Sequence, residues 1–434
     1  MLALIWAGVI LLCLMFYIIF DGYDLGIGIL SMFEKDKARK KEMLETVASN
    51  WDGNETWLVL LGVSLFAGFP LAFGIVLPYL YIPLICMLFA LIVRGVSIEL
   101  VSNEFHSKLW MRLFGIGSLV AALAQGIAIG AVMQVAAFEG ARYTGGVFDF
   151  FSVVSVTSAV TLVFVYVALG FGYLQHRHLS MQAESSALEL GGLMKRGKLG
   201  IILAGIAAVL MAFILQPWSL LAEATLVRTL AFWALLVASI GAFAVTAATF
   251  NRKRPGVPTF HERYLPFMGV VVAVVAFLLA FTVARYPQIL PNLTLAQTVS
   301  PDISVNFLII GIAILNIPLV LFYNWFSHRV FSGSVGKRSG GPVPDVVGGA
   351  YNSLVEAGSQ KQVLREPETA AHRLYRYLTN FLLGLICFVL YFACINLFGL
   401  NEMWHIATWA VVALLSLFSL GVWIMDEKRH GDDA

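Results

Sequence analysis

The stretch FDGYDLGIGIL (Phe20–Leu30) decides the fold, because it sets two carboxylates, Asp21 and Asp24, into an apolar run that extends from Leu2 to Phe33. A carboxylate in hydrocarbon costs several kcal/mol, so it normally faces the interior of a helix bundle or a water-filled path. The two aspartates are three residues apart and therefore share one helix face. We expect a membrane helix that turns its acids toward other helices.

A second acidic motif opens the next apolar run. NWDGNETWL (Asn50–Leu58) adds Asp52 and Glu55 at the same spacing of three residues. That spacing also fits a capping box at a helix N-terminus, so a purely local capping role stays open. Asp24 could likewise serve only to lock helix packing. The glycines around it let a neighbouring helix approach closely; they are Gly22, Gly26 and Gly28.

The composition indicates an all-α polytopic membrane protein. Of the 434 residues, 59% are hydrophobic and 12% charged, which excludes a soluble globular protein. The apolar runs are much longer than barrel strands of about ten residues. We predict eleven spans: Leu2–Phe33, Glu55–Phe69, Leu71–Leu100, Phe114–Val135, Phe150–Tyr173, Gly200–Leu215, Leu226–Phe250, Tyr264–Ala284, Ser304–Phe326, Tyr377–Phe398 and Met403–Ile424.

Three regions follow from this pattern. Residues 1–331 form a predicted core of nine helices, arranged as two four-helix bundles plus a ninth helix. Residues 332–375 begin with a Gly/Ser/Pro-rich linker without an apolar period. Residues 376–434 add a transmembrane hairpin and a polar tail. The apolar N-terminal run has no basic residue before it and no small-residue cleavage site, so we expect it to remain as the first span.

Basic residues predict the orientation. They gather in alternate connections, while the other connections hold little beyond Arg142 and Arg285. By the positive-inside rule, we expect the N-terminus outside and the C-terminus in the cytoplasm. The basic residues are Arg39, Lys40, Lys41, Lys108, Arg112, Arg177, Lys195, Arg196, Lys198, Arg252, Lys253, Arg254, Lys428 and Arg429.

No cofactor held by this chain's own ligands is predicted. A haem in a bundle needs axial His, Met or Cys ligands from the spans. Seven histidines lie in or beside predicted cytoplasmic connections, and His405 sits at the outer edge of a span; the seven are His106, His176, His178, His261, His328, His372 and His430. The four cysteines form no Cys-x-x-Cys pair, which is typical of packing residues; they are Cys13, Cys86, Cys387 and Cys394.

The spans hold an excess of acid. Five carboxylates, Asp21, Asp24, Asp52, Glu55 and Glu99, face one predicted buried base, Arg94. They cannot all ionise against one guanidinium in low dielectric, so some are protonated or hydrated, as a proton path requires. Glu99 could instead be the partner of Arg94 or an interfacial acid. Two glutamines predicted on the fourth span, Gln125 and Gln134, fit interhelical hydrogen bonds.

Together these motifs resemble subunit II of the cytochrome bd-type quinol oxidases. The resemblance rests on DGYDLGIG and NWDGNETWL and covers about residues 1–331. Four further features match in order: Arg94 at the end of the third span, YTG at Tyr143–Gly145, GYLQHR at Gly172–Arg177, and the RYP turn before the ninth span.

The resemblance implies a partner, a haem-bearing subunit I that carries haems b and d, oxidises quinol and reduces dioxygen to water with cytoplasmic protons. It implies that Asp52 lines a cytoplasmic proton route and that Asp24 lies deeper. Glu99 stands where the family often has an aspartate on that route. Trp51 matches a tryptophan beside a structural quinone found in some members. Small accessory subunits are compatible with the family, and no nucleic acid is expected.

The last hundred residues depart from the family, whose members commonly end soon after the ninth span. We expect the extra hairpin to pack at the periphery. Two other hypotheses stay open: a secondary transporter that uses the acids for proton coupling, and a purely structural assembly subunit. The chain lacks paired broken helices in matching halves, which disfavours the transporter.

Overall fold

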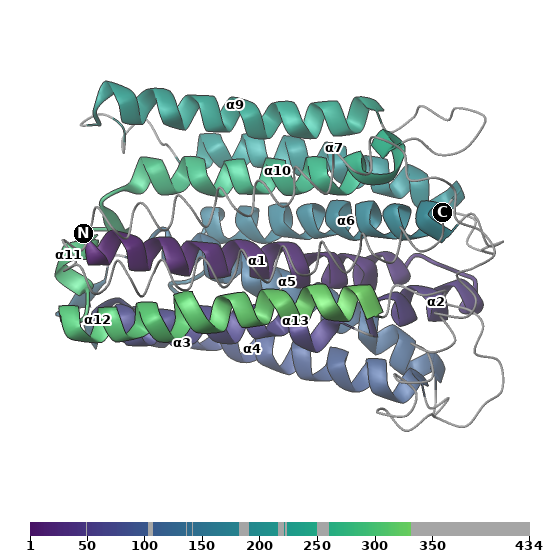
Figure 1. Cartoon of the computed structure of the whole chain (residues 1–434), viewed down its shortest axis with the longest axis horizontal. Helices are drawn as coiled ribbons and strands as arrows, with labels where there is room; N and C mark the ends of the chain where they lie inside the picture. Colours follow the sequence, from purple (N-terminus) through teal and green to yellow (C-terminus); the bar gives the residue numbers. More distant parts are fainter. Residues whose placement is uncertain are drawn as a thin grey trace, which may run out of the picture. The chain divides into compact units, whose positions relative to one another are not determined.

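The computed structural model describes residues 1–330, apart from 49, 103–106, 136, 141, 182–190, 216–220, 222–223 and 250–259. The predicted linker and C-terminal hairpin lie outside these residues. Long helices run alongside one another (Figure 1). In chain order the helices are α1 (Leu2–Ser31), α2 (Lys37–Ala48), α3 (Trp51–Gly68), α4 (Pro70–Ser102), α5 (Ser107–Val132), α6 (Val153–Met181), α7 (Gly191–Ile214), α9 (Leu226–Thr249), α10 (Phe260–Arg285), α11 (Leu295–Thr298), α12 (Asp302–Leu308) and α13 (Ile317–Val330).

The ninth predicted span is one continuous path in which a π-helix, η1 (Ile309–Asn316), joins α12 to α13. Two short hairpins complete the described structure. Strands β1 (Phe138–Glu139) and β2 (Arg142–Tyr143) pair between α5 and α6. Strands β3 (Gln288–Leu290) and β4 (Leu293–Thr294) pair after α10. Both hairpins lie in connections that the sequence predicts outside the membrane.

The predicted fold class is confirmed in its main feature, an all-helical protein with many membrane spans. In the described part, eight helical segments are long and apolar enough to cross a membrane, where the sequence predicts nine. Helix α3 is the exception. Its first two turns carry Asp52, Asn54 and Glu55, which lower its mean hydropathy. It nonetheless packs along α1.

Two local predictions are wrong. The basic connection after the first span is not a plain loop, because residues 37–48 form helix α2, which buries Met43, Leu44 and Val47 in the core. Gln134 lies in a turn after the end of α5 and is exposed, so it makes no interhelical contact of the predicted kind. Several helices also run past the predicted ends, because a helix can continue through polar residues beyond an apolar run.

Helix contacts fall into two sets. Helices α1, α3, α4 and α5 contact one another, and so do α6, α7, α9 and α10. Helix α6 joins the sets through α1 and α5. At the α1–α6 crossing, a Cβ at Gly170 would lie 2.6 Å from the carbonyl carbon of Gly26, and a Cβ at Gly26 would overlap the backbone of Tyr166. Small residues therefore bring the two backbones together, as membrane helix packing requires.

A buried carboxylate–guanidinium cluster

Arg94 is the centre of the candidate site. Its guanidinium is fully buried on α4, where it reaches two other helices. Nη1 donates to Asp21 Oδ1 of α1 at 2.7 Å, and Nη2 donates to Glu55 Oε1 of α3 at 2.8 Å. Asp21 is also buried, whereas the Glu55 side chain keeps 25% of its surface exposed. Such charge-assisted bonds are the strong kind, and they hold three helices in one register.

Asp24 has different surroundings, although it lies only one helical turn from Asp21. Asn54 Nδ2 donates to Asp24 Oδ2 and to the hydroxyl of Tyr23, both at 2.8 Å. Asp24 and Asn54 are fully buried. The two aspartates therefore serve separate partners, an ion pair on α4 and an amide on α3. Sequence reasoning missed Asn54; its place within NWDGNET, one position before Glu55, is the signal that could have found it.

Several buried polar atoms of this cluster make no hydrogen bond to a described group. They are Asp21 Oδ2, Asp24 Oδ1, Asn54 Oδ1 and Arg94 Nε. Buried polar atoms are normally satisfied by protein or by ordered water, so each one needs an explanation. Four such atoms in one cluster indicate a site where ordered water or a further group completes the hydrogen bonds.

Asp52 and Glu99 are both exposed; Asp52 lies three residues before Glu55 on α3, and Glu99 lies five residues after Arg94 on α4. Asp52 Oδ1 accepts a hydrogen bond from the backbone N–H of Gly53 at 2.8 Å. The capping-box alternative is wrong: Asn50 is the N-cap residue of α3, and Glu55 turns to Arg94 instead of back toward the helix start. The pairing of Glu99 with Arg94 stays a prediction; the ion pairs that the structure gives Arg94 are those with Asp21 and Glu55.

A second polar group lies beside the cluster. Gln125 Nε2 of α5 donates to the hydroxyl of Tyr17 on α1, and the Tyr166 hydroxyl of α6 donates to Gln125 Oε1 at 2.7 Å. All three side chains are buried. This confirms the interhelical hydrogen bond predicted for Gln125. The group ties the first set of helices to α6.

Trp51 packs its ring against the backbone of α4. A Cβ at Gly95 would lie 2.9 Å from Trp51 Cη2. The ring therefore covers the position next to Arg94, and part of it stays exposed.

Within the described residues, no three His, Cys, Asp or Glu side chains are placed to hold a metal ion. His176 is the one histidine whose side chain is described, and its ring lies 4.8 Å from that of Tyr264.

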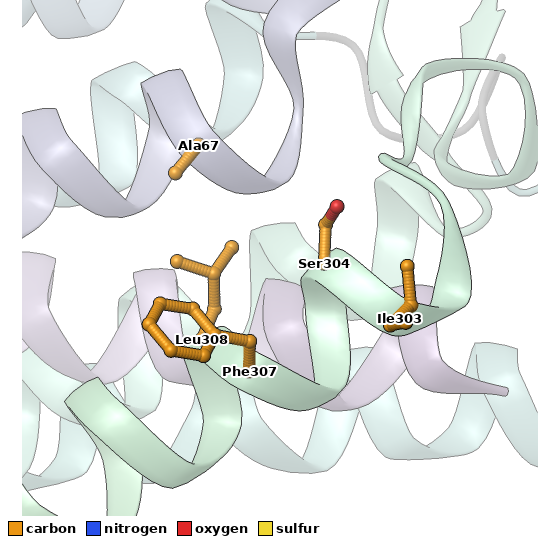
Figure 2. A pocket seen from close by; sticks show the side chains of 5 residues that line it. All are labelled: Ala67, Ile303, Ser304, Phe307 and Leu308. Atoms are coloured by element: carbon orange, nitrogen blue, oxygen red, sulfur yellow. The ribbon is translucent and has the colours of Figure 1, made fainter.

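A surface hollow of about 490 Å³ lies elsewhere, between the end of α3 and α12 (Figure 2). It is mostly apolar, and its lining includes Ala67, Ser304 and Phe307. Ala67 follows Glu55 by twelve residues, so the hollow lies about 18 Å along the helix from the cluster. It shares no residue with the site.

The fold and the cluster define a class: a multi-pass helical membrane protein that buries carboxyl groups around a single arginine. The family profile described as "Cytochrome bd terminal oxidase subunit II" matches residues 2–331. The chain belongs to this family.

Individual relatives agree with the family. The chain is 28% identical over 204 residues to the cytochrome bd-I ubiquinol oxidase subunit 2 of Escherichia coli K12, covering 44% of this chain and 54% of that protein. It is 30% identical over 155 residues to the cytochrome bd ubiquinol oxidase subunit 2 of Bacillus subtilis, covering 33% and 44%. The chain thus spans about half the length of the relatives it matches.

A solved structure shares the fold. A chain of the bd oxidase from Geobacillus thermodenitrificans superposes with a TM-score of 0.54 at 17% identity, covering 75% of this chain and 98% of that one.

Proposed function

We propose that this chain is the subunit without haem of a bd-type terminal oxidase in the bacterial cytoplasmic membrane. In this proposal a haem-bearing subunit I oxidises quinol and reduces dioxygen to water, and the present chain supports it and admits protons from the cytoplasm. Family membership supports the assignment, as do relatives whose names are ubiquinol oxidase subunits.

One observation supports the proton route: two carboxyl groups, Asp21 and Glu55, bind one guanidinium, and a third, Asp24, is buried one helical turn from Asp21. Arg94 compensates the charge of Asp21 with one hydrogen bond from its guanidinium and binds Glu55 with a second. In the described part of the chain, the hydrogen-bond partner of Asp24 is the neutral amide of Asn54. Low dielectric favours the neutral acid where no cation is bound, so Asp24 is the group suited to carry a proton.

The proposed route runs from the surface inward. Asp52 and Glu99 are exposed at the rim and collect protons, and Glu55 lies half-buried between the rim and the interior. Asp24 receives the proton in the interior, while Asp21 and Arg94 hold the helices and the local charge fixed. An acid that is part exposed and part buried suits the transfer step, because it can meet water and still reach the cluster.

Cofactor chemistry belongs to the partner in this proposal. Haems b and d sit in subunit I and supply the redox step, and this chain ligates neither of them. A structural quinone remains expected beside Trp51, whose exposed part leaves an aromatic surface for such a molecule. The chain's own contribution is to position Arg94 and to move protons.

The proposal keeps the predicted topology. Nine core helices, including the short α3, have the N-terminus outside, so that α2 and its basic residues face the cytoplasm. The predicted linker and final hairpin lie outside the described residues. Small accessory subunits and lipid are the remaining expected partners.

The test is Asp52→Asn in the complex purified with its partner. We expect quinol-driven oxygen consumption to fall about tenfold or more, because proton transfer by a positioned acid contributes at least that much. The haem spectrum should stay unchanged. Asp302→Asn is the matched control, since Asp302 is an exposed acid in the first turn of α12. Unchanged turnover in Asp52→Asn, or a colourless preparation without a partner, would contradict the proposal.

A further inference from the structure

Asn324 of α13 is a buried amide that the proposed route does not use. Its side chain is 5% exposed, and its Nδ2 makes no hydrogen bond to a described group. Asn316 on the same helix path differs, because it is exposed and donates to the carbonyl oxygen of Gly311 at 3.2 Å. A buried amide donor without an acceptor is unfavourable unless water completes it.

The position of Asn324 relates it to the route. A Cβ at Gly53 would lie 2.7 Å from Asn324 Oδ1 and 2.8 Å from Tyr323 Cε1, so α13 closes directly over the first turn of α3. Gly53 separates Asp52, which is exposed, from Asn54, which is buried and bonded to Asp24. Asn324 therefore lies at the one residue that separates the outer acid from the inner pair.

The buried polar atoms without a partner include a donor on α13 and acceptors on α3 and α1. Asn324 offers a donor, while Asn54 Oδ1 and Asp24 Oδ1 are buried acceptors without a partner. They come from three helices, α13, α3 and α1. Buried polar atoms without a protein partner are commonly satisfied by ordered water, which itself needs two to four such partners.

We infer that Asn324 is a positioning residue of the proton inlet: it holds water over Gly53 and so links Asp52 to the Asn54–Asp24 pair. The ninth helix is then a wall of the inlet and not only a lipid-facing helix. This inference rests on the proposed function and adds a residue outside both acidic motifs.

The experiment measures quinol oxidation by the intact complex carrying Asn324→Leu, Asn324→Ser or, as the matched control on the same helix path, Asn316→Leu. We expect the Leu variant to lower kcat about fivefold, since it removes the hydrogen bonds that hold the water. KM for quinol and haem content should be unchanged. The Ser variant should restore most of kcat because its hydroxyl can hold water, and Asn316→Leu should have no effect.

Two outcomes would overturn the inference. The first is an equal kcat in Asn324→Leu and in the Asn316→Leu control. The second is an equal loss of kcat in Asn324→Leu and Asn324→Ser, which would indicate a packing role for Asn324. If the Leu variant loses haem, Asn324→Ala replaces it in the comparison with Ser. Asp52→Asn separates the two proposals. A slow Asp52→Asn with a normal Asn324→Leu refutes only the role of Asn324, whereas normal turnover in both refutes the route as well.

Discussion

The two sets of helices differ in what they bury. In the described residues, the buried charged side chains are Asp21, Asp24 and Arg94, all in α1 and α4 of the first set. The second set buries serine, threonine and glutamine instead. Ser239 Oγ, for example, donates to the carbonyl oxygen of Ala273 at 2.7 Å. A hydroxyl on a backbone carbonyl stabilises packing at little cost, whereas a buried carboxylate is unfavourable without a partner.

This difference indicates a division of work. The first set accepts the cost of buried charge and offsets it with one arginine, which is the pattern expected of a functional site. The second set buries no charged side chain among the described residues, and we interpret it as a structural support for the first set. The sets meet where Gly26 faces Gly170 and where Gln125 joins Tyr17 to Tyr166. Substitutions in the two sets should therefore have unequal effects.

The largest effect is expected for Arg94→Met. It leaves Asp21 buried without its cation, and breaking a buried pair in this way costs about 3–5 kcal/mol. We expect little intact complex after purification and a much lower Tm for what remains. Ser239→Ala, the counterpart in the second set, should cost about 1 kcal/mol. Equal Tm values for the two variants would remove the distinction between the sets.

A smaller loss is expected at the junction of the sets. Gly26→Ala places a methyl group against the backbone of α6, which cannot move aside as a side chain can, and such overpacking costs about 1–3 kcal/mol. Gly241→Ala on α9 is the control, because a Cβ there meets nothing within 4 Å. Thermal unfolding of the complex measures both. Equal stability would show that the two sets are not in close contact at Gly26.

The smallest effect concerns the connection between the sets. The Tyr143 hydroxyl donates to Asp149 Oδ2 at 3.0 Å, and Tyr79 Oη of α4 donates to the backbone oxygen of Asp149 at 3.2 Å. Tyr143→Phe should lower stability by about 1 kcal/mol or less, and Tyr81→Phe, on the exposed side of α4, should not.

The pH dependence of this contact has a definite sign. Burial, followed by the hydrogen bond to Asp149, raises the pKa of Tyr143 from 10.0 to about 12. The folded protein therefore holds the phenol proton more tightly than the unfolded chain does. Its contribution is complete below pH 10 and is lost as the pH rises from 10 toward 12. A difference between wild type and Tyr143→Phe that grows with pH would contradict this assignment.

Much of the fold could be predicted from the apolar runs alone, because only helices and closed barrels satisfy the backbone in lipid and these runs are too long for barrel strands. Helix α2 could not, since its apolar residues are few and its buried face appears only when the helix packs on the core. The members of the acidic cluster could be predicted because carboxylates are rare in spans. Their partners could not: Asp21 and Asp24 share a spacing that suggests one environment, yet one binds Arg94 and the other binds Asn54.

The sequence by itself determined that this protein is a helical membrane protein and which acids matter, because both conclusions follow from the cost of polar groups in hydrocarbon. Only the tertiary structure decided how charge is distributed among those acids. A single guanidinium can bind at most the carboxylates within reach of its fork, and helix packing alone selects which two they are. For the same reason Asn324, far from either motif along the chain, could be related to the site only through the contact of α13 with Gly53.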